Sequence, residues 1–154
     1  MTLKTFKTAQ KGFTLIELLV VIGILAVLLA ITLIAINPAK QFAQANNTKR
    51  RSDVNAILNS INQYMADNKG ALPAGITTTS LEIRKTGGAD LCAILVPQYI
   101  AALPVDPLTV NGTPVTDCTA AYNTAYEVSQ STTNSRITVT APDAELQETI
   151  SVTR

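Results

Sequence analysis

A single carboxylate, Glu17, lies near the start of a long apolar run in this sequence. The stretch that follows it, residues 18–36, contains no charged side chain. A charged carboxylate at the centre of a membrane-spanning helix costs roughly 2.5–3.5 kcal/mol, and less near the interface. Such a group normally marks a function or has a partner, so Glu17 is the first candidate functional residue. The simpler alternative is that Glu17 reaches the lipid headgroups from its place near the end of the run.

The other residue types argue against catalysis. The 154-residue chain has no His, which removes the commonest general base and the commonest metal ligand. It contains no phosphate-binding loop and no nucleophile-elbow motif. Its two Cys are too few for a structural zinc site. A formal net charge of +1 also argues against nucleic-acid binding. We therefore expect a protein that is not an enzyme and does not bind nucleic acid.

Residues 18–36 are long enough to cross a bilayer, which takes about 20 helical residues. A buried core helix is the alternative, but soluble helices seldom lack a polar face over this length. Lys4, Lys7 and Lys11 precede the run with no acid beside them, which places the N-terminus in the cytoplasm. An ordinary secretory signal is disfavoured, because the run is too long and the small boundary residue, Gly12, comes before it.

The stretch KGFTLIELLVVIGIL, residues 11–25, closely resembles the N-terminal signature of type IV pilins and pseudopilins, the class III prepilin signal. The resemblance implies that a membrane peptidase cuts between Gly12 and Phe13 and then methylates the amine of Phe13. It also gives Glu17 the position of the glutamate that meets the free amine of a neighbouring subunit during assembly. Pairing of Glu17 with the Phe13 amine of the same helix is also sterically possible.

The chain divides into four expected segments. A leader peptide, residues 1–12, precedes a transmembrane and assembly helix, residues 13–36. An amphipathic continuation of the helix follows at 37–69, and a globular α+β region at 70–154. Pro38 should kink or interrupt the helix within the loop-like sequence INPAK. The continuation carries apolar residues at helical spacing, which are Val54, Ile57, Leu58, Ile61, Tyr64 and Met65.

The C-terminal region predicts a small sheet. Alternating apolar residues predict strands around Leu81–Arg84, Tyr126–Val128, Ile137–Val139 and Ile150–Val152. The simplest topology is an antiparallel meander of three or four strands whose apolar face covers the stripe from Val54 to Met65. The expected fold class is therefore α+β and pilin-like, with a long N-terminal helix packed on a small antiparallel sheet.

Two cysteines, Cys92 and Cys118, fall on the expected exterior side of the membrane. An oxidising compartment favours one disulfide between them, and two free thiols are the alternative. Because they are 26 residues apart, the bridge would contribute about 3.5 kcal/mol in the chain-entropy model.

The segment YIAALPVDP, residues 99–107, resembles a segment of major pseudopilins and several pilins. We interpret it as a rigid connector, in which Asp106 folds back onto its own backbone. Some major pseudopilins hold calcium in this region. Asp106 and Asp117, with the carbonyls of residues 109–116, are therefore calcium candidates, although no spacing matches a calcium motif. We expect no other cofactor or metal.

A basic run, Lys49-Arg50-Arg51, follows on the same side of the membrane. We interpret it as solvated helix surface, with Arg50 paired to Asp53 three residues later. The sharper alternative is a contact with an acidic patch on a neighbouring subunit.

Together these features predict a structural subunit of a type IV pilus-like extracellular filament. The subunit would cross the inner membrane once, with its N-terminus in the cytoplasm, before it joins an extracellular or periplasmic filament of identical copies. The resemblance implies three partners: a prepilin peptidase, an assembly ATPase and an inner-membrane platform protein. One alternative is a major pseudopilin of a type II secretion system, which the LPVDP segment favours. The other is a monomeric membrane-anchored binding module, which needs neither the glutamate nor the peptidase site.

Overall fold

The computed structural model describes residues 12–154. The expected leader, including Lys4, Lys7 and Lys11, therefore lies outside the described residues except for Gly12. The described chain divides into two units, a first that ends at Ala39 and a second that comprises Lys40–Arg154.

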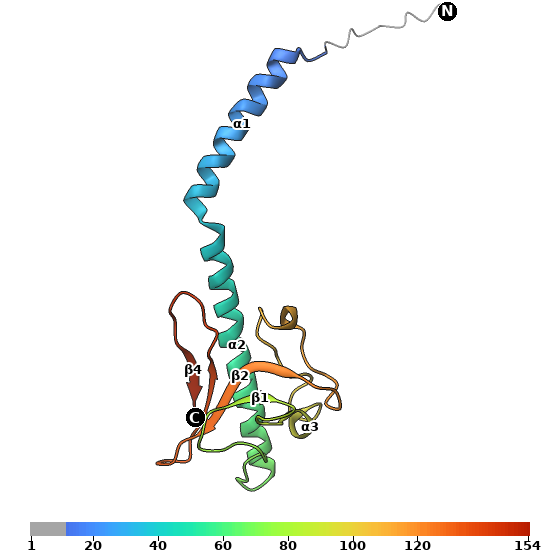
Figure 1. Ribbon diagram of the computed structural model, residues 1–154, viewed down its shortest axis with the longest axis vertical. Coiled ribbons are helices and arrows are strands. Elements are labelled where there is room, and N and C mark those ends of the chain that lie inside the picture. Colours follow the sequence, from blue (N-terminus) through green and yellow to red (C-terminus); the bar gives the residue numbers. More distant parts are fainter. Residues whose placement is uncertain (1–11) are drawn as a thin grey trace, which may run out of the picture. The chain divides into compact units, whose positions relative to one another are not determined.

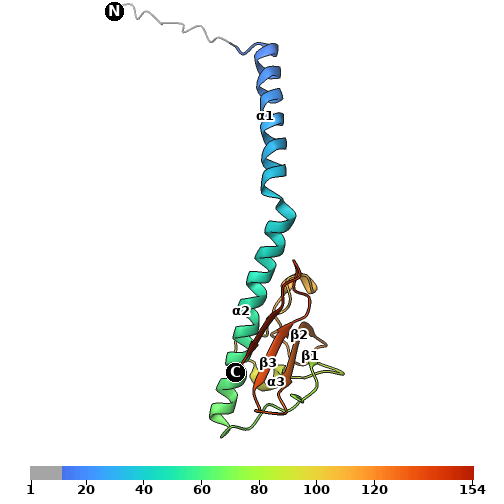
Figure 2. The ribbon, with the colours of Figure 1, turned by 90° about the vertical axis from the view of Figure 1, so that its left-hand side faces the viewer.

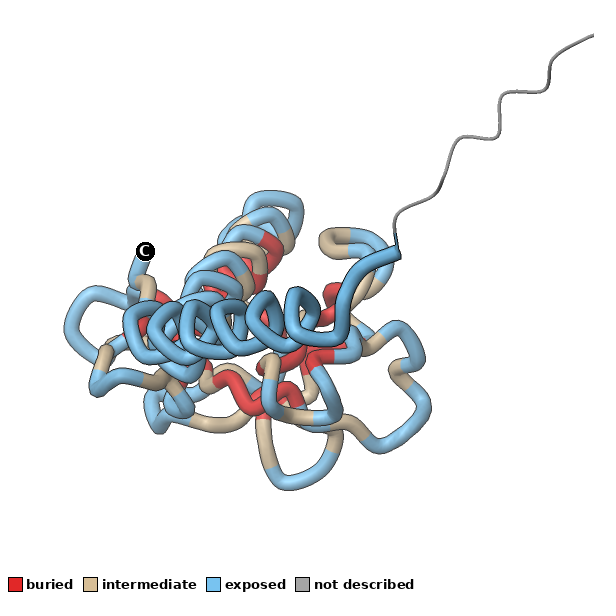
Figure 3. The backbone as a smooth tube through the Cα atoms, turned by 90° about the horizontal axis from the view of Figure 1, so that it is seen from above, coloured by how far each residue is buried: buried red, intermediate tan, exposed pale blue. Residues whose placement is uncertain are grey.

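The apolar run forms one helix, α1 (Leu15–Ile36), which continues without a break through Gly23 (Figure 1). None of the 22 residues of this fully described helix is buried, and the tube of Figure 3 has the colour of exposed residues along the whole helix. By length and composition α1 is able to cross a membrane. Its 22 residues correspond to about 33 Å, slightly more than the roughly 30 Å of a bilayer core.

A second helix, α2 (Pro38–Asp67), begins after one non-helical residue, Asn37. Asn37 has φ 45° and ψ 78°, a left-handed conformation that Asn tolerates better than most residues. The following proline also disfavours the right-handed helical region at this position. Pro38 then takes the first helical position, where a missing N–H is harmless. The expected interruption is therefore present, but it is confined to one residue and INPAK is not a loop.

Four short strands form one sheet in chain order. Each neighbouring pair is antiparallel, and Val139 lies in register between Val128 and Val152. The strands are β1 (Leu81–Arg84), β2 (Asn123–Gln130), β3 (Ile137–Ala141) and β4 (Ile150–Thr153). This is the α+β meander that the sequence predicted.

The long connection from β1 to β2 contains two further elements, the short helix α3 (Cys92–Leu95) and the 3-10 turn η1 (Val110–Gly112). A β-bridge between Leu103 and Val115 closes the loop that carries η1. The connection therefore holds both the disulfide and the LPVDP segment of the sequence.

The core of the second unit lies between α2 and the sheet, which run side by side in Figure 2. The first four members of the predicted stripe are fully buried, and Tyr64 and Met65 are partly buried at its edge. The sheet contributes Ile83, Tyr126, Val128 and Val139, which are also fully buried. The predicted role of the stripe is confirmed.

Replacing Leu58 with Ala should lower the free energy of unfolding of the second unit by about 2–5 kcal/mol, because it leaves a cavity at a fully buried position. Gln63→Ala, at an exposed position of the same helix, should change it by less than about 0.5 kcal/mol. Chemical unfolding of the full chain in detergent, followed by the near-ultraviolet circular dichroism of its tyrosines, measures both. Equal losses in the two variants would contradict the packing of α2 on the sheet.

Candidate functional site

The first turn of α1 places the Glu17 carboxylate on the backbone that precedes the helix. Thr14 is the N-cap, and its hydroxyl accepts a hydrogen bond from the backbone N–H of Glu17 at 3.3 Å. The backbone N–H and the hydroxyl of Thr14 donate to Glu17 Oε2 at 2.8 and 2.6 Å. This reciprocal arrangement is a capping box, which satisfies N–H groups that the helix itself leaves free. The sequence contains the capping-box pattern Thr14-x-x-Glu17. The sequence analysis considered Glu17 for assembly and did not predict this capping box.

The two hydrogen bonds that this carboxylate accepts reach the same oxygen, Oε2. Among the described residues, Oε1 accepts none. The carboxylate also lies at the positive end of the helix dipole, which favours negative charge. Glu17 is therefore held at the helix start through one carboxylate oxygen, and the other oxygen accepts no hydrogen bond from the described residues.

Gly12 and Phe13 lie just before this capped turn and are both exposed, Phe13 with 85 % of its surface. A Cβ built on Gly12 meets no atom within 4 Å, and its φ lies outside the range that favours glycine. The fold of the described chain therefore gives no reason for glycine at position 12.

In the second unit, the structure places Arg50 in a site that the sequence did not predict. Its side chain is fully buried, and its guanidinium pairs with both oxygens of Asp106, at 2.6 Å from Nε and 3.1 Å from Nη2. Nη1 donates to Glu145 at 2.8 Å and to Asn47 at 3.0 Å. Burial alone lowers the pKa of Arg50, but the hydrogen bonds to Asp106 and Glu145 outweigh it and raise that pKa.

Two asparagines of α2 complete the site around Glu145. Asn47 accepts from the backbone N–H of Glu145 at 2.9 Å and donates to its carbonyl at 2.8 Å. Asn46 donates to the Glu145 carboxylate at 2.8 Å. The hydrogen bonds from Asn46 and Arg50 hold the pKa of Glu145 below its usual value of 4.5. We call Arg50, Asp106, Glu145, Asn46 and Asn47 the Arg50 cluster.

The predicted pairing of Arg50 with Asp53 is wrong, and so is the description of Arg50 as solvated surface. Asp53 instead accepts a hydrogen bond from the Tyr126 hydroxyl at 2.8 Å. Burial raises the pKa of Asp53 despite that hydrogen bond. Only Lys49 and Arg51 of the basic run are exposed, and Arg51 pairs with Glu148 at the surface.

The structure also gives the two calcium candidates other roles. Asp106 is 1 % exposed and bound by Arg50, and it accepts from the backbone N–H of Leu108 at 2.9 Å, which confirms the predicted Asx turn. Asp117 accepts from the backbone N–H and the hydroxyl of Thr119, and the hydroxyl hydrogen bond is the first cause of its lowered pKa. Residues 12–154 contain no group of three or more His, Cys, Asp or Glu side chains able to hold a metal ion. Both oxygens of the Asp106 carboxylate accept hydrogen bonds from Arg50.

A disulfide joins Cys92 to Cys118, whose Cα atoms lie 5.3 Å apart. It ties α3 to the loop that follows the Leu103–Val115 bridge. Nearby, the Tyr122 hydroxyl donates to Asp90 at 2.7 Å and accepts from the backbone N–H of Cys92 at 3.1 Å. The disulfide and these hydrogen bonds fix a part of the chain that has little regular structure.

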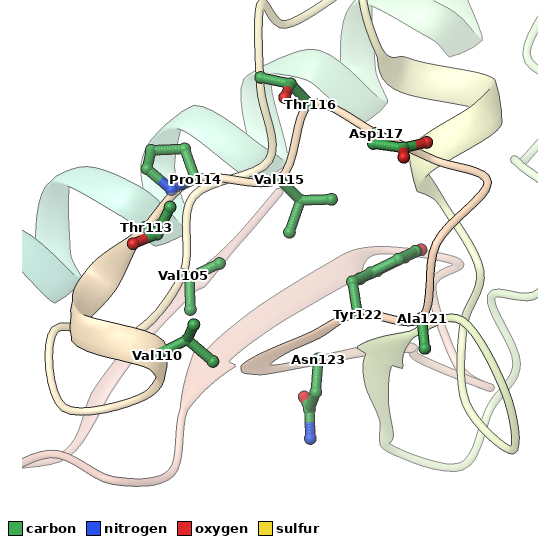
Figure 4. Close-up of a pocket in the computed structure, with 10 residues that line it drawn as sticks. All are labelled: Val105, Val110, Thr113, Pro114, Val115, Thr116, Asp117, Ala121, Tyr122 and Asn123. Carbon is green, nitrogen blue, oxygen red and sulfur yellow. The ribbon is translucent and has the colours of Figure 1, made fainter.

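An open groove of about 250 Å³ lies on this side of the second unit (Figure 4). Its lining is largely apolar, with Val105, Val110, Pro114 and Val115 around it. Of the residues that line it, Asp117 is the one with a charged side chain. The groove thus offers apolar contact and lacks a paired set of groups for acid–base chemistry.

A comparison with protein-family models finds one match, to the prokaryotic N-terminal methylation motif over residues 7–33. This motif is the class III prepilin signal of type IV pilins and pseudopilins, so the resemblance stated from residues 11–25 is confirmed. The match contains Gly12, Phe13 and Glu17 and ends inside α1. The chain matches no curated protein and no solved structure.

The Arg50 cluster predicts a large difference between two adjacent arginines. Arg50→Met should lower the free energy of unfolding by about 3–5 kcal/mol, because it leaves the buried Asp106 carboxylate unpaired. Arg51→Met removes an exposed pair and should cost less than about 1 kcal/mol. Chemical unfolding of the full chain in detergent at pH 7 measures both, and similar losses would refute the role of the cluster.

Glu145 should make stability depend on pH in the acid range. Because its pKa is lowered in the folded chain, the stabilisation it gives is complete well above pH 4.5 and is lost as the pH falls through the folded pKa. The unsubstituted chain should therefore be more stable than Glu145→Gln at pH 7, and the difference should shrink below pH 4.5. Glu148→Gln on the same connection is the control, and its effect should be small because that pair is exposed. A difference for Glu145→Gln that stays constant from pH 7 to pH 3 contradicts the charged contact with Arg50.

Proposed function

Because residues 7–33 carry the methylation motif of type IV pilins and pseudopilins, we propose that this protein is a structural subunit of a type IV pilus-like filament. The observation that carries the proposal is α1, an apolar helix with no buried residue and with a carboxylate in its first turn. Lipid supplies the apolar surroundings before assembly. Identical helices in the filament supply them afterwards.

The proposed processing step fits the chemistry of the segment before α1. A prepilin peptidase cuts the peptide bond between Gly12 and Phe13, which frees the α-amine of Phe13, and the amine is then methylated. Both residues lie outside the helix and are exposed, which supports access by the enzyme. A glycine that the fold itself does not require also supports recognition from outside the chain.

The proposed topology is a single pass through the inner membrane with the N-terminus in the cytoplasm. Lysines in the leader and an uncharged span support this orientation. The second unit, with its disulfide, then lies on the oxidising side, where such a bond is stable. An assembly ATPase and an inner-membrane platform protein draw the subunit out of the membrane.

Glu17 is the proposed assembly residue, and its partner is the Phe13 amine of a neighbouring subunit. The capping box fixes the carboxylate at the helix start without using Oε1. Transfer of α1 from lipid to a bundle of identical helices replaces one apolar environment with another, so its net cost in hydrophobic free energy is small.

A major pseudopilin of a type II secretion system is the second candidate, favoured by the LPVDP segment around Asp106. In this chain Asp106 serves the Arg50 cluster, a role inside the subunit that is compatible with either filament. Long fibres on the cell surface would favour the pilus. A monomeric membrane-anchored binding module would leave the mature chain with an uncut leader.

The charge of Glu17 and its capping role are separable by substitution. Glu17→Gln retains the capping box, because Gln serves at this position, and it should leave membrane insertion and leader removal intact. It removes the charge, so filament growth should be blocked or slowed. Thr14→Ala is the matched control, since it removes the capping hydroxyl, keeps the carboxylate and should still assemble.

Two measurements on cells with intact export machinery test this prediction. Intact mass reports leader removal and methylation, and electron microscopy with immunoblotting of sheared material reports filament yield. A normal yield of filaments from processed Glu17→Gln would disprove the charge pairing and leave capping as the role of Glu17.

A further inference from the structure

The η1 turn contains the dipeptide Asn111-Gly112, and the fold favours Asn at the first position and requires Gly at the second. Asn111 has φ 53° and ψ 28°, a left-handed conformation that Asn tolerates better than most residues. Gly112 is buried with φ 64°, and a Cβ on it would lie 2.7 Å from Lys49 Nζ and 3.2 Å from Pro107 Cα. Backbone conformation and lack of space therefore select this pair of residues.

Asn followed by Gly is also a reactive setting for an asparagine side chain. The backbone nitrogen of the next residue attacks Asn Cγ, and glycine at that position has no side chain to hinder the attack. Asn111 is exposed, and no hydrogen bond within the part of the chain that the structure describes holds its side chain. Its amide group is thus free to turn toward an attacking nitrogen.

The reaction takes two steps and consumes only water. In the first step the Gly112 nitrogen gives its proton to solvent and bonds to Asn111 Cγ, while the bond from Cγ to Nδ2 breaks. The leaving nitrogen takes a proton from solvent and departs as ammonia, and a cyclic succinimide remains. In the second step water opens the ring. Addition of water at Cγ gives Asp, and addition at the main-chain carbonyl carbon gives isoaspartate, whose backbone runs through the former side chain.

The folded turn holds the reacting atoms in an unreactive arrangement. Ring closure needs the Gly112 nitrogen nearly eclipsed with Cβ about the Cα–C bond of Asn111. At ψ 28° that nitrogen lies roughly 150° from Cβ, because Cβ is offset by about 120° from the backbone nitrogen of its own residue. The nitrogen and the side chain therefore lie on opposite sides of the bond, and closure requires a large rotation of ψ.

Three hydrogen bonds oppose that rotation. Thr113 N–H donates to the Val110 carbonyl at 3.1 Å, across the turn that Figure 4 shows between these two labelled residues. Gly112 N–H, which must lose its proton in the reaction, donates to the Thr109 carbonyl at 2.8 Å. Lys49 donates to the Gly112 carbonyl at 3.3 Å and so ties the turn to α2.

We propose that Asn111 is a deamidation site that the fold keeps closed and that reacts when the η1 turn opens, with Lys49 as the clamp on the turn. The Asp product tolerates the same left-handed backbone, so the turn re-forms with one added negative charge. Isoaspartate adds an atom to the backbone where Gly112 has no spare room, so the turn stays open and Lys49 loses its acceptor. The reaction involves the second unit alone and does not depend on filament assembly.

The test follows residue 111 in the full chain in detergent at pH 8. Mass spectrometry of the peptide that contains it measures total deamidation, and labelling by an isoaspartate methyltransferase measures the isoaspartate product. The same chain, reduced, alkylated and dissolved in guanidinium chloride, provides the open state, because reduction releases the loop between Cys92 and Cys118.

The unfolded chain should deamidate at Asn111 at least about tenfold faster than the folded chain, since the folded turn must first open locally. Lys49→Met should speed the reaction in the folded chain roughly twofold to tenfold, the effect of losing one hydrogen bond. Lys49→Arg keeps a donor and should keep the slow rate. Arg51→Met is the matched control on the same helix, because Arg51 pairs with Glu148 and not with the turn, and it should also leave the rate unchanged.

Three outcomes would overturn the inference. Equal rates in the folded and unfolded chains would show that the turn does not protect Asn111. An unfolded chain that stays unmodified at this residue would show that Asn111 is not a reactive site. A Lys49→Met chain with the near-ultraviolet circular dichroism and the deamidation rate of the unsubstituted chain would show that Lys49 does not clamp the turn.

Discussion

Burial of apolar surface divides this molecule in two. No residue of the fully described helix α1 is buried, whereas α2 buries eight residues, although a single non-helical residue, Asn37, separates the helices. The sheet covers α2 and supplies the core of residues 40–154. Within the described chain nothing comparable covers α1. Its apolar side chains therefore depend on lipid or on other copies, and this dependence makes both membrane anchoring and assembly physically reasonable.

The second unit uses two kinds of interaction along the same helix. From Val54 to Ile61, α2 meets the sheet through apolar contacts, whereas one turn earlier Arg50 makes a buried ionic contact. A buried ion pair is weak evidence for net stability, because desolvation offsets the attraction. Here the guanidinium gathers Asp106 and Glu145 from two connections that have no strand to align them. The Arg50 cluster is better understood as fixing where these connections lie.

Local sequence patterns predicted the helices and strands, but they did not predict the charged partners that lie far away in the sequence. The uncharged run, the helical stripe and the alternating strands depend on neighbours in sequence, so periodicity was sufficient. The partners of Arg50 are 56 and 95 residues away, and spacing favoured Asp53 instead. The predicted pair with Asp53 was wrong, because the Asp53 carboxylate accepts a hydrogen bond from the Tyr126 hydroxyl of the sheet. The capping box of Glu17 was local and could have been predicted from Thr14-x-x-Glu17.

The capping box lowers the free-energy cost of placing the Glu17 carboxylate near lipid. A carboxylate that accepts two hydrogen bonds at a helix N-terminus is partly compensated within its own chain, so the lone subunit is not strongly destabilised by it. Under the proposed assembly, a neighbour's amine does not have to displace Thr14, because Oε1 accepts no hydrogen bond among residues 12–154. Assembly then adds a charged contact to the existing cap. On this proposal, the same residue would be tolerable in a single membrane subunit and favourable in a filament, where the amine and carboxylate would meet among surrounding apolar helices.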